Sequence, residues 1–489
     1  RNRGKLNAIS SSDTSVGWYF SSPLFGESSV LNGSFVHFEN NVVTAPFAAN
    51  GEQCSFNVNS GSAATWNGNV MVSTVPSGGG SAFTLAGVAL SNNATFNITN
   101  ETWAAGTVGV SRITLQHFST LRISNCTGTN LNNFWLGLTA TTYDGEPDLF
   151  PVWLTNASFI DLVGNQFGFL STFTTIPVSI KLVSLAQSSH VRLLDNQWTN
   201  LPRPQASSTV TGGGSFPPCI AFASPALSVT NRSSVRVERN QVTLAPRIGN
   251  VADPYANDEK APAIGFIGVV SVSYLSSVQL TANTLSGGAI AFFSDVIVSS
   301  QSLVVVRNQT IHDPYTAMTC QGNVLLNDSS IFDLAGNMLS VAQVSFRGYV
   351  TANNNSQFHV RWNSISVAAA ISPIVFDVDL SHIPDRWQSY YHADDYASVF
   401  GGYVEVPTYG VIFHAVFNVT NGSALDVSCN NVTVTANAFG AVAFVFMGSF
   451  PLWVPQRFVE TSTNLPTSLI SQSTAFVINA NNITIVDPL

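Results

Sequence analysis

The sequence predicts an all-β protein that folds as a parallel β-helix, a solenoid of about 13–14 coils with loop insertions. Three observations lead to this prediction. A ten-residue phrase recurs along the chain, a further apolar stretch precedes most copies of it, and charged residues make up only 9% of the composition. The phrase returns mostly every 25–45 residues, which indicates a repeat in which each copy contributes one coil.

The phrase is a small polar residue followed by x-apolar-x-apolar-x-x-Asn-x-apolar. In the copy that begins at Ser158, Ile160 and Leu162 form the apolar pair and Asn165 is the asparagine. Full copies begin at Ser34, Ser62, Ser158, Ser189, Ser233, Ser276, Ser330, Ser356, Ser423 and Thr474, and weaker copies begin at Asn93, Ser119 and Gln301. The alternative is a large β-sandwich or barrel with Gly- and Asn-rich turns, but such folds do not repeat one phrase in register.

Each phrase predicts one β-strand. Alternation with period two places the apolar pair on one face of the strand and the residue between them on the other face. We expect these intervening residues to form a hydrated outer face, because most are polar and their charges are mixed: His37, Thr65, Asp161, Arg192, Arg236, Gln279, Asp333, His359 and Asp426. The preceding apolar stretches, such as residues 178–182, supply further strands to each coil.

The asparagine of the phrase suits a bend after the strand. Asparagine tolerates left-handed backbone angles, and its side-chain amide can bond to the chain above and below. Stacked asparagines form a hydrogen-bonded ladder, as in other in-register β-stacks. The expected ladder contains Asn41, Asn69, Asn165, Asn196, Asn240, Asn283, Asn337, Asn363, Asn430 and Asn481. In the weaker copies the same position is assigned to Asn100, Cys126 and Asn308.

The spacing of these positions indicates one elongated domain over residues 1–489. Intervals of 25–31 residues fit a bare coil and intervals of 39–44 fit a coil with an inserted loop, whereas the 67-residue interval before Asn430 predicts an extra coil and an insertion. Insertions are expected near 143–151, 199–219, 246–262, 380–408 and 450–468. Functional residues concentrate on such loops because a rigid scaffold positions them.

A chain with so little charge needs another source of solubility, and N-linked glycans would supply it. The sequence has 44 Asn, only three Lys and 14 Asn-x-Ser/Thr sequons. We expect glycans at Asn32, Asn93, Asn97, Asn125, Asn156, Asn231, Asn327, Asn354, Asn418, Asn421, Asn431 and Asn482. Asn100 and Asn308 are expected to be bare, because a buried ladder amide cannot carry a glycan. The alternative is that Asn and Ser simply crowd the turns.

The placement of some sequons supports glycosylation more than their number does. In five of them the sequon serine is also the first residue of the repeat phrase. These five acceptors are Asn32, Asn156, Asn231, Asn354 and Asn421. They are expected to occupy the same turn in different coils, so that their glycans form a column along one edge of the rod.

Several classes of site are not expected. The five cysteines, Cys54, Cys126, Cys219, Cys320 and Cys429, lie 72 to 109 residues apart without a CxxC or Cys/His cluster, so we expect no metal and no cofactor beyond covalent glycans. Their disulfide pairing is left open. The net charge of −9 argues against nucleic acid. No apolar run approaches the ~20 residues of a membrane span, and the missing initial Met suggests a mature segment whose signal sequence has been removed.

Catalysis is not expected either. Glycoside hydrolysis needs two carboxylates that face each other across the scissile bond. Asp377 and Asp379 are weak candidates because they alternate onto one strand face, but solvated loop acids are the commoner explanation. Trp387 and the tyrosines of the same insertion could stack on sugar rings, or they could pack the loop against the rod.

The repeats resemble those of two known groups of proteins. The segments SSVRVERNQVTL, SSVQLTANTLSG and SSIFDLAGNMLSV resemble repeats of the dispersed-gene-family surface glycoproteins of kinetoplastid protozoa, and the phrase as a whole resembles right-handed parallel β-helices of the pectin-lyase-like type. The resemblance covers most of residues 30–485. It implies a right-handed coil and a secreted or cell-surface glycoprotein with an adhesive or structural role. It carries over no catalytic residues, because the polygalacturonase signatures are absent as sets.

The sequence therefore favours an extracellular structural glycoprotein, a surface-coat or fibril subunit covered by N-glycans. Soluble solenoids cap their ends, and no capping amphipathic helix is visible at either end of this sequence. Open ends invite end-to-end self-association. The alternative function is a carbohydrate-binding or polysaccharide-degrading β-helix, in which Asp377, Asp379 or Trp387 would contact the sugar.

Overall fold

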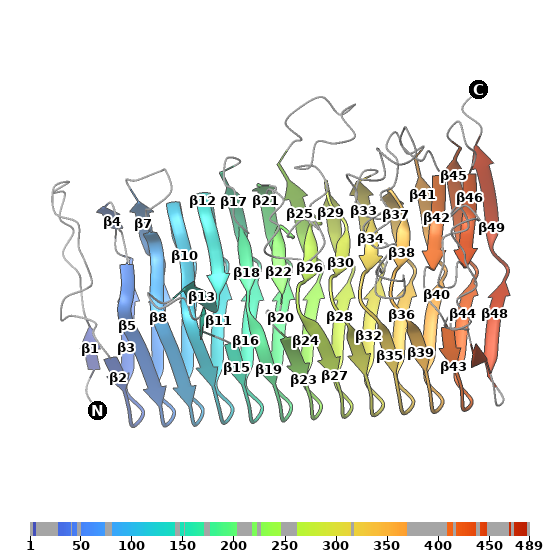
Figure 1. Ribbon diagram of the computed structural model, residues 1–489. Helices are drawn as coiled ribbons and strands as arrows, with labels where there is room; N and C mark the ends of the chain where they lie inside the picture. The colour runs from blue at the N-terminus through green and yellow to red at the C-terminus, as the bar shows by residue number, and fades with distance from the viewer. Residues whose placement is uncertain are drawn as a thin grey trace.

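The computed structural model describes residues 3–5, 28–40, 42–45, 50–73, 81–141, 147–150, 152–170, 177–202, 218–222, 226–245, 262–313, 317–368, 408–413, 417–436, 441–446, 469–470 and 474–486. Every helix or strand within these ranges is a β-strand. The strands stack along one axis into an elongated rod, with the first strand at one end and the last at the other (Figure 1). The predicted parallel β-helix is confirmed.

Each coil contributes strands to four parallel columns. The first column is a 14-stranded parallel sheet. In stacking order its strands are β1 (Arg3–Lys5), β3 (Phe35–Glu39), β6 (Ala63–Asn67), β9 (Thr95–Thr99), β11 (Thr120–Ser124), β16 (Phe159–Val163), β20 (His190–Leu194), β24 (Ser234–Glu238), β28 (Ser277–Thr281), β32 (Leu303–Arg307), β36 (Ile331–Ala335), β40 (Gln357–Arg361), β44 (Ala424–Ser428) and β48 (Ala475–Asn479).

The second column follows directly in each coil. It begins with β4 (Val42–Ala45) and β7 (Val70–Ser73), continues through the first residues of the long strands β10 (Thr102–Leu115) and β12 (Thr127–Leu136), and is then built from separate strands. These are β17 (Gln166–Phe169), β21 (Gln197–Leu201), β25 (Gln241–Leu244), β29 (Thr284–Ser286), β33 (Thr310–Asp313), β37 (Met338–Val341), β41 (Ser364–Val367), β45 (Asn431–Thr435) and β49 (Asn482–Val486).

The third and fourth columns return the chain to the next coil. The third passes through β5 (Asn50–Asn59), β8 (Ser81–Ser91), β10 and β12 to β18 (Val178–Ile180), β22 (Ile220–Phe222), β26 (Ile264–Phe266), β30 (Ile290–Phe292), β34 (Met318–Cys320), β38 (Val344–Phe346), β42 (Thr408–Phe413) and β46 (Ala441–Phe446). The fourth contains β2 (Ser28–Val30), the last residues of β5, β8 and β10, then β15 (Val152–Leu154), β19 (Leu182–Leu185), β23 (Ala226–Val229), β27 (Val269–Val272), β31 (Val296–Val298), β35 (Val324–Leu326), β39 (Val350–Ala352), β43 (Phe417–Val419) and β47 (Leu469–Ile470).

The repeat phrase determines the first column. Each of the thirteen copies, including the three weaker ones, forms one strand of this sheet, and only β1 lacks the phrase. Neighbouring strands pair without a register shift, so that Ile160 of β16 lies beside Val191 of β20, which in turn lies beside Val235 of β24. These apolar positions are fully buried. Alternation along each strand therefore fills the interior of the solenoid.

One expectation about coil number is wrong. The 67 residues between Asn363 and Asn430 contain no additional coil, because β40 pairs directly with β44 and the side chains of the two asparagines are hydrogen-bonded. The extra length is one insertion between β41 and β42. The spacing of the asparagines alone could not distinguish an additional coil from a long insertion, because both lengthen the interval between two ladder positions by the same number of residues.

Aromatic side chains stack through the core in register with the strands. In the third column Phe222, Phe266 and Phe292 are paired neighbours, and their ring centroids are 5.2 and 4.9 Å apart. The rings of Phe266 and Phe292 are nearly parallel, with an interplanar angle of 5°. Parallel in-register strands place identical side chains one strand spacing apart, so the same residue type can stack from coil to coil.

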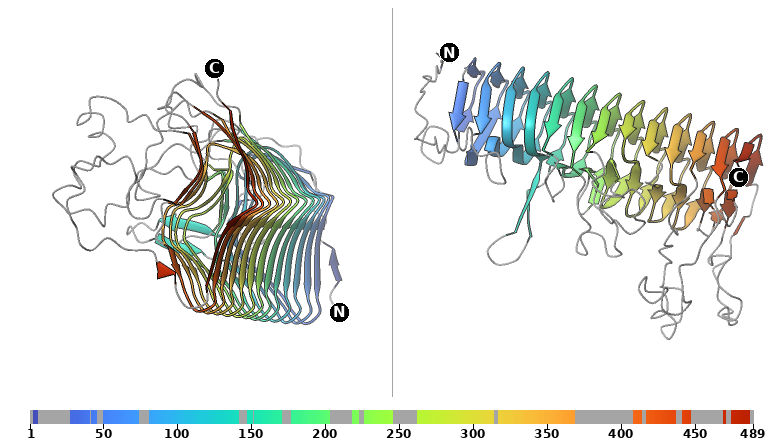
Figure 2. Two further views of the ribbon diagram at one scale, coloured as in Figure 1. Left: turned by 90° about the vertical axis from the view of Figure 1, so that its right-hand side faces the viewer. Right: turned by 90° about the horizontal axis from the view of Figure 1, so that it is seen from above.

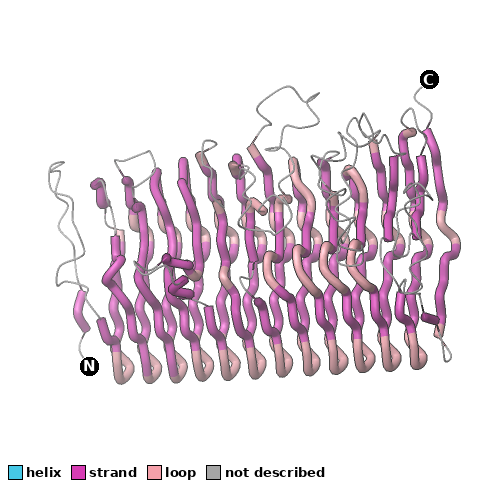
Figure 3. Tube along the Cα trace, viewed as in Figure 1, coloured by secondary structure: helices cyan, strands magenta, loops and turns pink. Residues whose placement is uncertain are grey.

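Three of the four connections between columns are named here, and they differ in how they tolerate length. We call the residues between the first and second columns the ladder corner (Arg239–Asn240 in one coil), those between the fourth and first the turn edge (230–233), and those between the second and third the open corner (287–289). Figure 3 shows the turn edge as a row of similar short loops at the bottom of the rod. The open corner receives insertions of very different length.

Most of the expected insertions coincide with residues that the structure does not describe. These are 142–146, 151, 203–217, 246–261, 369–407 and 447–468. The first is bracketed by a hairpin in which β13 (Leu138–Thr141) pairs antiparallel with β14 (Pro147–Phe150). This hairpin projects from the side of the rod (Figure 2).

Candidate functional surfaces

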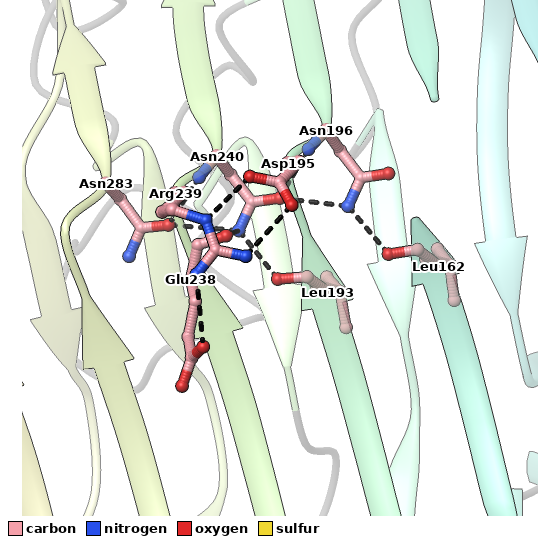
Figure 4. Close-up of polar contacts among 8 residues, drawn as sticks. All are labelled: Leu162, Leu193, Asp195, Asn196, Glu238, Arg239, Asn240 and Asn283. Atoms are coloured by element: carbon pink, nitrogen blue, oxygen red, sulfur yellow. Dashed lines mark hydrogen bonds and ion pairs between the residues drawn. The ribbon is translucent and has the colours of Figure 1, made fainter. Parts of the chain in front are cut away.

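The asparagine ladder is a continuous chain of buried hydrogen bonds. The Asn240 amide nitrogen donates to Leu193 O at 2.9 Å, in the coil before, and to Asn283 Oδ1 at 3.0 Å, in the coil after. Its own Oδ1 accepts from both the backbone N and the Nδ2 of Asn196, at 3.0 and 2.9 Å (Figure 4). One side chain thus satisfies polar groups in both neighbouring coils.

The ladder contains the predicted asparagines wherever the structure describes them. They are Asn69, Asn165, Asn196, Asn240, Asn283, Asn337, Asn363, Asn430 and Asn481. Asn41 lies outside the described residues. The left-handed backbone angle, however, belongs to the residue before each of them, for example Asp195 and Arg239, with φ of 57° and 52°.

Two assignments to the ladder are wrong by one residue. Glu101, rather than Asn100, receives the hydrogen bond from Asn69 Nδ2, at 2.8 Å. Gln309, rather than Asn308, receives the bond from Asn283, at 3.1 Å. In both copies the ladder position holds a residue other than asparagine, and an asparagine happens to precede it. Register with the neighbouring coils decides the position, and the isolated phrase does not contain that information.

Glu101 is the ionisable member of this ladder. Its side chain is 1% exposed, Oε1 accepts from the backbone N and Nδ2 of Asn69, and Oε2 has no hydrogen-bond partner. Burial raises the pKa of Glu101 to about 7, although the two bonds from Asn69 act in the opposite direction. Cys126 follows in the next coil, where burial raises the pKa of its thiol to about 12. This part of the ladder therefore loses stability as Glu101 ionises.

A second ladder, of serines, was not foreseen from the sequence. The serines that directly precede the first-column strands β16 to β40 are buried, and each donates its backbone N–H to the hydroxyl of the serine in the next coil. The series runs Ser158, Ser189, Ser233, Ser276, Ser302, Ser330, Ser356 and Ser423, with N–Oγ distances of 3.0 to 3.4 Å. The recurrent serine in the phrase was the available signal. From β16 to β44, both ends of each first-column strand are therefore fixed by side-chain bonds between coils.

The turn edge carries the five acceptor asparagines that were expected to share one turn. Asn32, Asn156, Asn231, Asn354 and Asn421 all have φ between 53° and 58° and begin a two-residue left-handed turn. Neighbouring turns are hydrogen-bonded through their backbones, as in the bond from Asn355 N to Asn421 O of 2.9 Å. The predicted column of acceptors thus exists as a geometric feature.

The remaining sequon asparagines occupy varied positions. Asn93, Asn125, Asn431 and Asn482 are exposed, whereas Asn97, Asn327 and Asn418 are partly buried. Asn418 lies within β43, and its Oδ1 is buried without a partner. Asn100 and Asn308, which were expected to be bare, are exposed at the ladder corner.

The outer face of the first column is less hydrated than predicted. Asp161, Asp333 and His359 are only 6%, 0% and 6% exposed. The reason is that neighbouring coils supply covering partners. Arg192 Nε and Nη2 bond both oxygens of Asp161 at 2.7 and 2.6 Å.

Asp333 is covered in the same way by three basic groups. Arg307 Nε bonds Oδ2, while His359 Nδ1 and Arg361 Nε each lie 3.4 Å from Oδ1. Burial opposes ionisation of Asp333, but the nearby His359 ring, the hydrogen bond from Arg307 and the charges of Arg307 and Arg361 lower its pKa overall. The cluster is a structural ion network within the sheet.

At the ladder corner a more exposed ion pair lies outside the buried amides. Arg239 Nε and Nη2 bond the Asp195 carboxylate at 2.7 and 2.9 Å, and Arg239 Nη1 is 3.7 Å from Glu238 (Figure 4). The hydrogen bond from Arg239 is the main cause of a lowered pKa of Asp195. The corner thus has a dry inner layer and a charged outer layer.

The chemical candidates named from the sequence lie mostly outside the described residues. This applies to Asp377, Asp379 and Trp387 and to the side chain of Cys54. Among the described cysteines, Cys126, Cys219 and Cys320 are buried and Cys429 is exposed. The described residues contain no group of three or more His, Cys, Asp or Glu side chains placed to hold a metal ion. In the described part of the chain there is no helix long and apolar enough to cross a membrane.

No family model, curated protein or solved structure matches this chain. The functional argument therefore rests on the surfaces described above.

Proposed function

We propose that this chain is an extracellular structural glycoprotein, a subunit of a surface coat or fibril that associates end to end and carries N-glycans. The observation behind the proposal is the exposed apolar edge of the last described coil. Ile483 and Ile485 align with Val432 and Val434, which are fully buried, yet they are 50% and 48% exposed. Within the described residues no further coil covers these two side chains, whose counterparts in the preceding coil face the interior.

The hydrogen bonds of the asparagine ladder give the edge of the last described coil a direction. Asn165, Asn196, Asn240, Asn337, Asn363 and Asn430 each donate the backbone N–H and Nδ2 to Oδ1 of the asparagine in the coil that follows, as Asn430 does to Asn481 at 2.9 Å in both bonds. Asn481 Nδ2 donates back to Val427 O, and within the described residues no following coil accepts from Asn481. A coil that covers this edge must run parallel and present an amide oxygen. A second copy stacked in the same direction would supply a parallel coil, in a head-to-tail contact that does not close.

An assembly experiment tests the proposal. The purified protein should form end-to-end oligomers or filaments by sedimentation and electron microscopy, with a mass that rises with concentration. Ile483→Glu combined with Ile485→Glu should abolish the assembly, because it would bury charge in the contact. Met338→Glu is the matched control, since Met338 is 62% exposed on the side of the rod. A wild-type chain that stays monomeric at high concentration would refute end-to-end assembly.

The sheath of glycans and the extracellular location belong to the same proposal. They are supported by the exposure of four of the five acceptors at the turn edge, with Asn156 partly exposed, and by the low charge of the chain. Contacts with external carbohydrate remain a secondary proposal, which depends on the insertion that contains Trp387.

A further inference from the structure

We propose that the ladder corner is a second row of N-glycan acceptors, formed by Asn100, Asn125 and Asn308. This inference rests on the proposed function, because the chain must pass through a glycosylating secretory compartment. It reverses the expectation that Asn100 and Asn308 are bare. That expectation required both residues to be ladder amides, and the ladder positions are occupied by Glu101 and Gln309 instead.

Asn308 and Asn125 have matching environments. Both are exposed, both have φ of 54°, and both precede the ladder residue of their coil. Each sequon has the same layout, because the middle residue is the buried ladder position, Gln309 or Cys126, and the threonine begins the second column. Any argument that accepts a glycan at Asn125 therefore applies to Asn308.

The following coil leaves room for both side chains. Gly164 follows Asn125 at the corner, and Gly336 follows Asn308. A Cβ atom on either glycine would lie 2.9 or 2.7 Å from the Oδ1 of that asparagine. Each carbonyl oxygen therefore packs against a bare backbone. The amide nitrogens of Asn125 and Asn308 make no hydrogen bond among the described residues, so Nδ2 is the atom available at the surface.

The chemistry of transfer is compatible with this geometry. Nδ2 loses one proton and forms a bond to the anomeric carbon of an oligosaccharide, while the lipid-linked diphosphate that carried the sugar leaves. Nδ2 keeps its second hydrogen. At Asn100 this hydrogen can maintain the bond to Asn67 Oδ1, which is 3.0 Å long. Because transfer precedes folding, the folded structure decides only whether the glycan is tolerated, and at these positions it projects away from the ladder.

Two rows of glycans would then border the first column. The turn edge supplies one row and the ladder corner supplies the other. Between Asn125 and Asn308 the corner residues are Gly164, Asp195, Arg239 and Ala282, none of which is an acceptor. This interval, which contains the exposed Asp195–Arg239 pair, is the part of the corner that remains uncovered.

Glycopeptide mapping of the secreted chain tests the inference. Enzymatic deglycosylation in ¹⁸O water should convert Asn308 and Asn125 to labelled Asp. Asn308→Gln and Thr310→Ala should each remove one glycan, whereas Thr284→Ala should remove none, because Thr284 pairs with Thr310 but belongs to no sequon. Adding Ala282→Asn to the Asn308→Gln chain should restore one glycan, since it creates a sequon one coil away at a residue with φ of 54°.

The outcomes separate the two proposals. Labelled Asn156 and Asn231 with unlabelled Asn308 would overturn the second row and leave the extracellular glycoprotein intact. A secreted chain without a glycan at any sequon would overturn both. Failure of Ala282→Asn to gain a glycan, while Asn308 is labelled in the parent, would show that tolerance is not a property of the corner and would also refute the inference as stated.

Discussion

The ladder corner and the open corner have opposite tolerance for length, although both connect neighbouring strands of one coil. At the ladder corner the connection is two residues in all thirteen described coils, from the pair before β4 to the pair before β49. At the open corner, where the two columns are separate strands, it varies from two residues between β37 and β38 to the long insertion between β41 and β42. The difference follows from the side-chain ladder, because each ladder amide bonds to both neighbouring coils and fixes where the next strand begins.

The largest expected difference between the two corners comes from inserting one glycine at each of them. Between Arg239 and Asn240 the insertion must displace either the ladder amide or β25, and a one-residue slip turns the buried Val242 outward. We expect a loss of about 4 kcal/mol or more, because several buried bonds and an apolar side chain are affected. After Gly287 at the open corner we expect a loss below about 1 kcal/mol. Urea unfolding of the two variants measures the contrast, and equal losses would contradict it.

The second effect is the removal of one ladder amide. Asn240→Leu leaves Leu193 O and the two Asn196 donors without their partner in a buried site. We expect the free energy of unfolding to fall by about 4 kcal/mol. Arg239→Ala is the matched control at the neighbouring exposed residue and should have a much smaller effect, since it removes only a surface ion pair. A loss of similar size in both variants would mean that the ladder does not dominate the corner.

The third effect depends on pH and concerns Glu101. Burial raises the pKa of Glu101 from its ordinary value of 4.5 to about 7, so between these pH values the folded state holds a proton that the unfolded state releases. Stability should therefore fall as pH rises from about 4.5 to 7 and stay level above that range. Glu101→Gln should remove this slope and, at pH 8, raise the free energy of unfolding by up to about 3 kcal/mol.

Gln309→Glu is the matched reverse change, because Gln309 holds the same ladder position and is 0% exposed. It should introduce a loss of stability with rising pH. Thermal unfolding of both variants and the parent at pH 4 and pH 8 provides the comparison. A parent with identical stability at the two pH values, matched by Glu101→Gln, would contradict the prediction.

The smallest expected effect concerns the left-handed residue that precedes the ladder position in each coil. Gly336 and Ala282 occupy the same left-handed position, with φ of 66° and 54°. Gly336→Ala should destabilise the protein and Ala282→Gly should stabilise it, each by about 1 kcal/mol, because alanine is strained at positive φ. Gly336→Ala additionally brings a Cβ toward Asn308 Oδ1, at 2.7 Å. Differential scanning calorimetry should resolve the two opposite shifts, and shifts of the same sign would contradict this account.

The sequence predicted the first column well because its signal is local. The period-two alternation around Ile160 and Leu162, repeated in register, is enough to specify a strand and its buried face. The prediction from sequence failed for properties that depend on residues of a neighbouring coil. The buried state of Asp333 arises from Arg307 and Arg361 in adjacent strands, and no feature within its own phrase distinguishes it from an exposed acid.

Glycan acceptors show the same division. The shared turn of Asn156 and Asn231 was visible in the phrase, because the sequon and the repeat coincide there. The position of Asn308 could not be read from the phrase, because Asn308 and Gln309 are adjacent there. Only the hydrogen bonds of Gln309 with Asn283 and Asn337, in the neighbouring coils, decide which of the two residues is buried.

By itself, then, the sequence determined the coil, the strands of the first column and the asparagines that could stack, because each follows from a short periodic pattern in covalent order. Only the tertiary structure decided which residue of each corner enters the ladder, which acids are buried and where 67 residues add a loop rather than a coil. The physical reason is that these choices are made by hydrogen bonds between coils, whose partners are tens of residues apart in the chain and a single strand spacing apart in space.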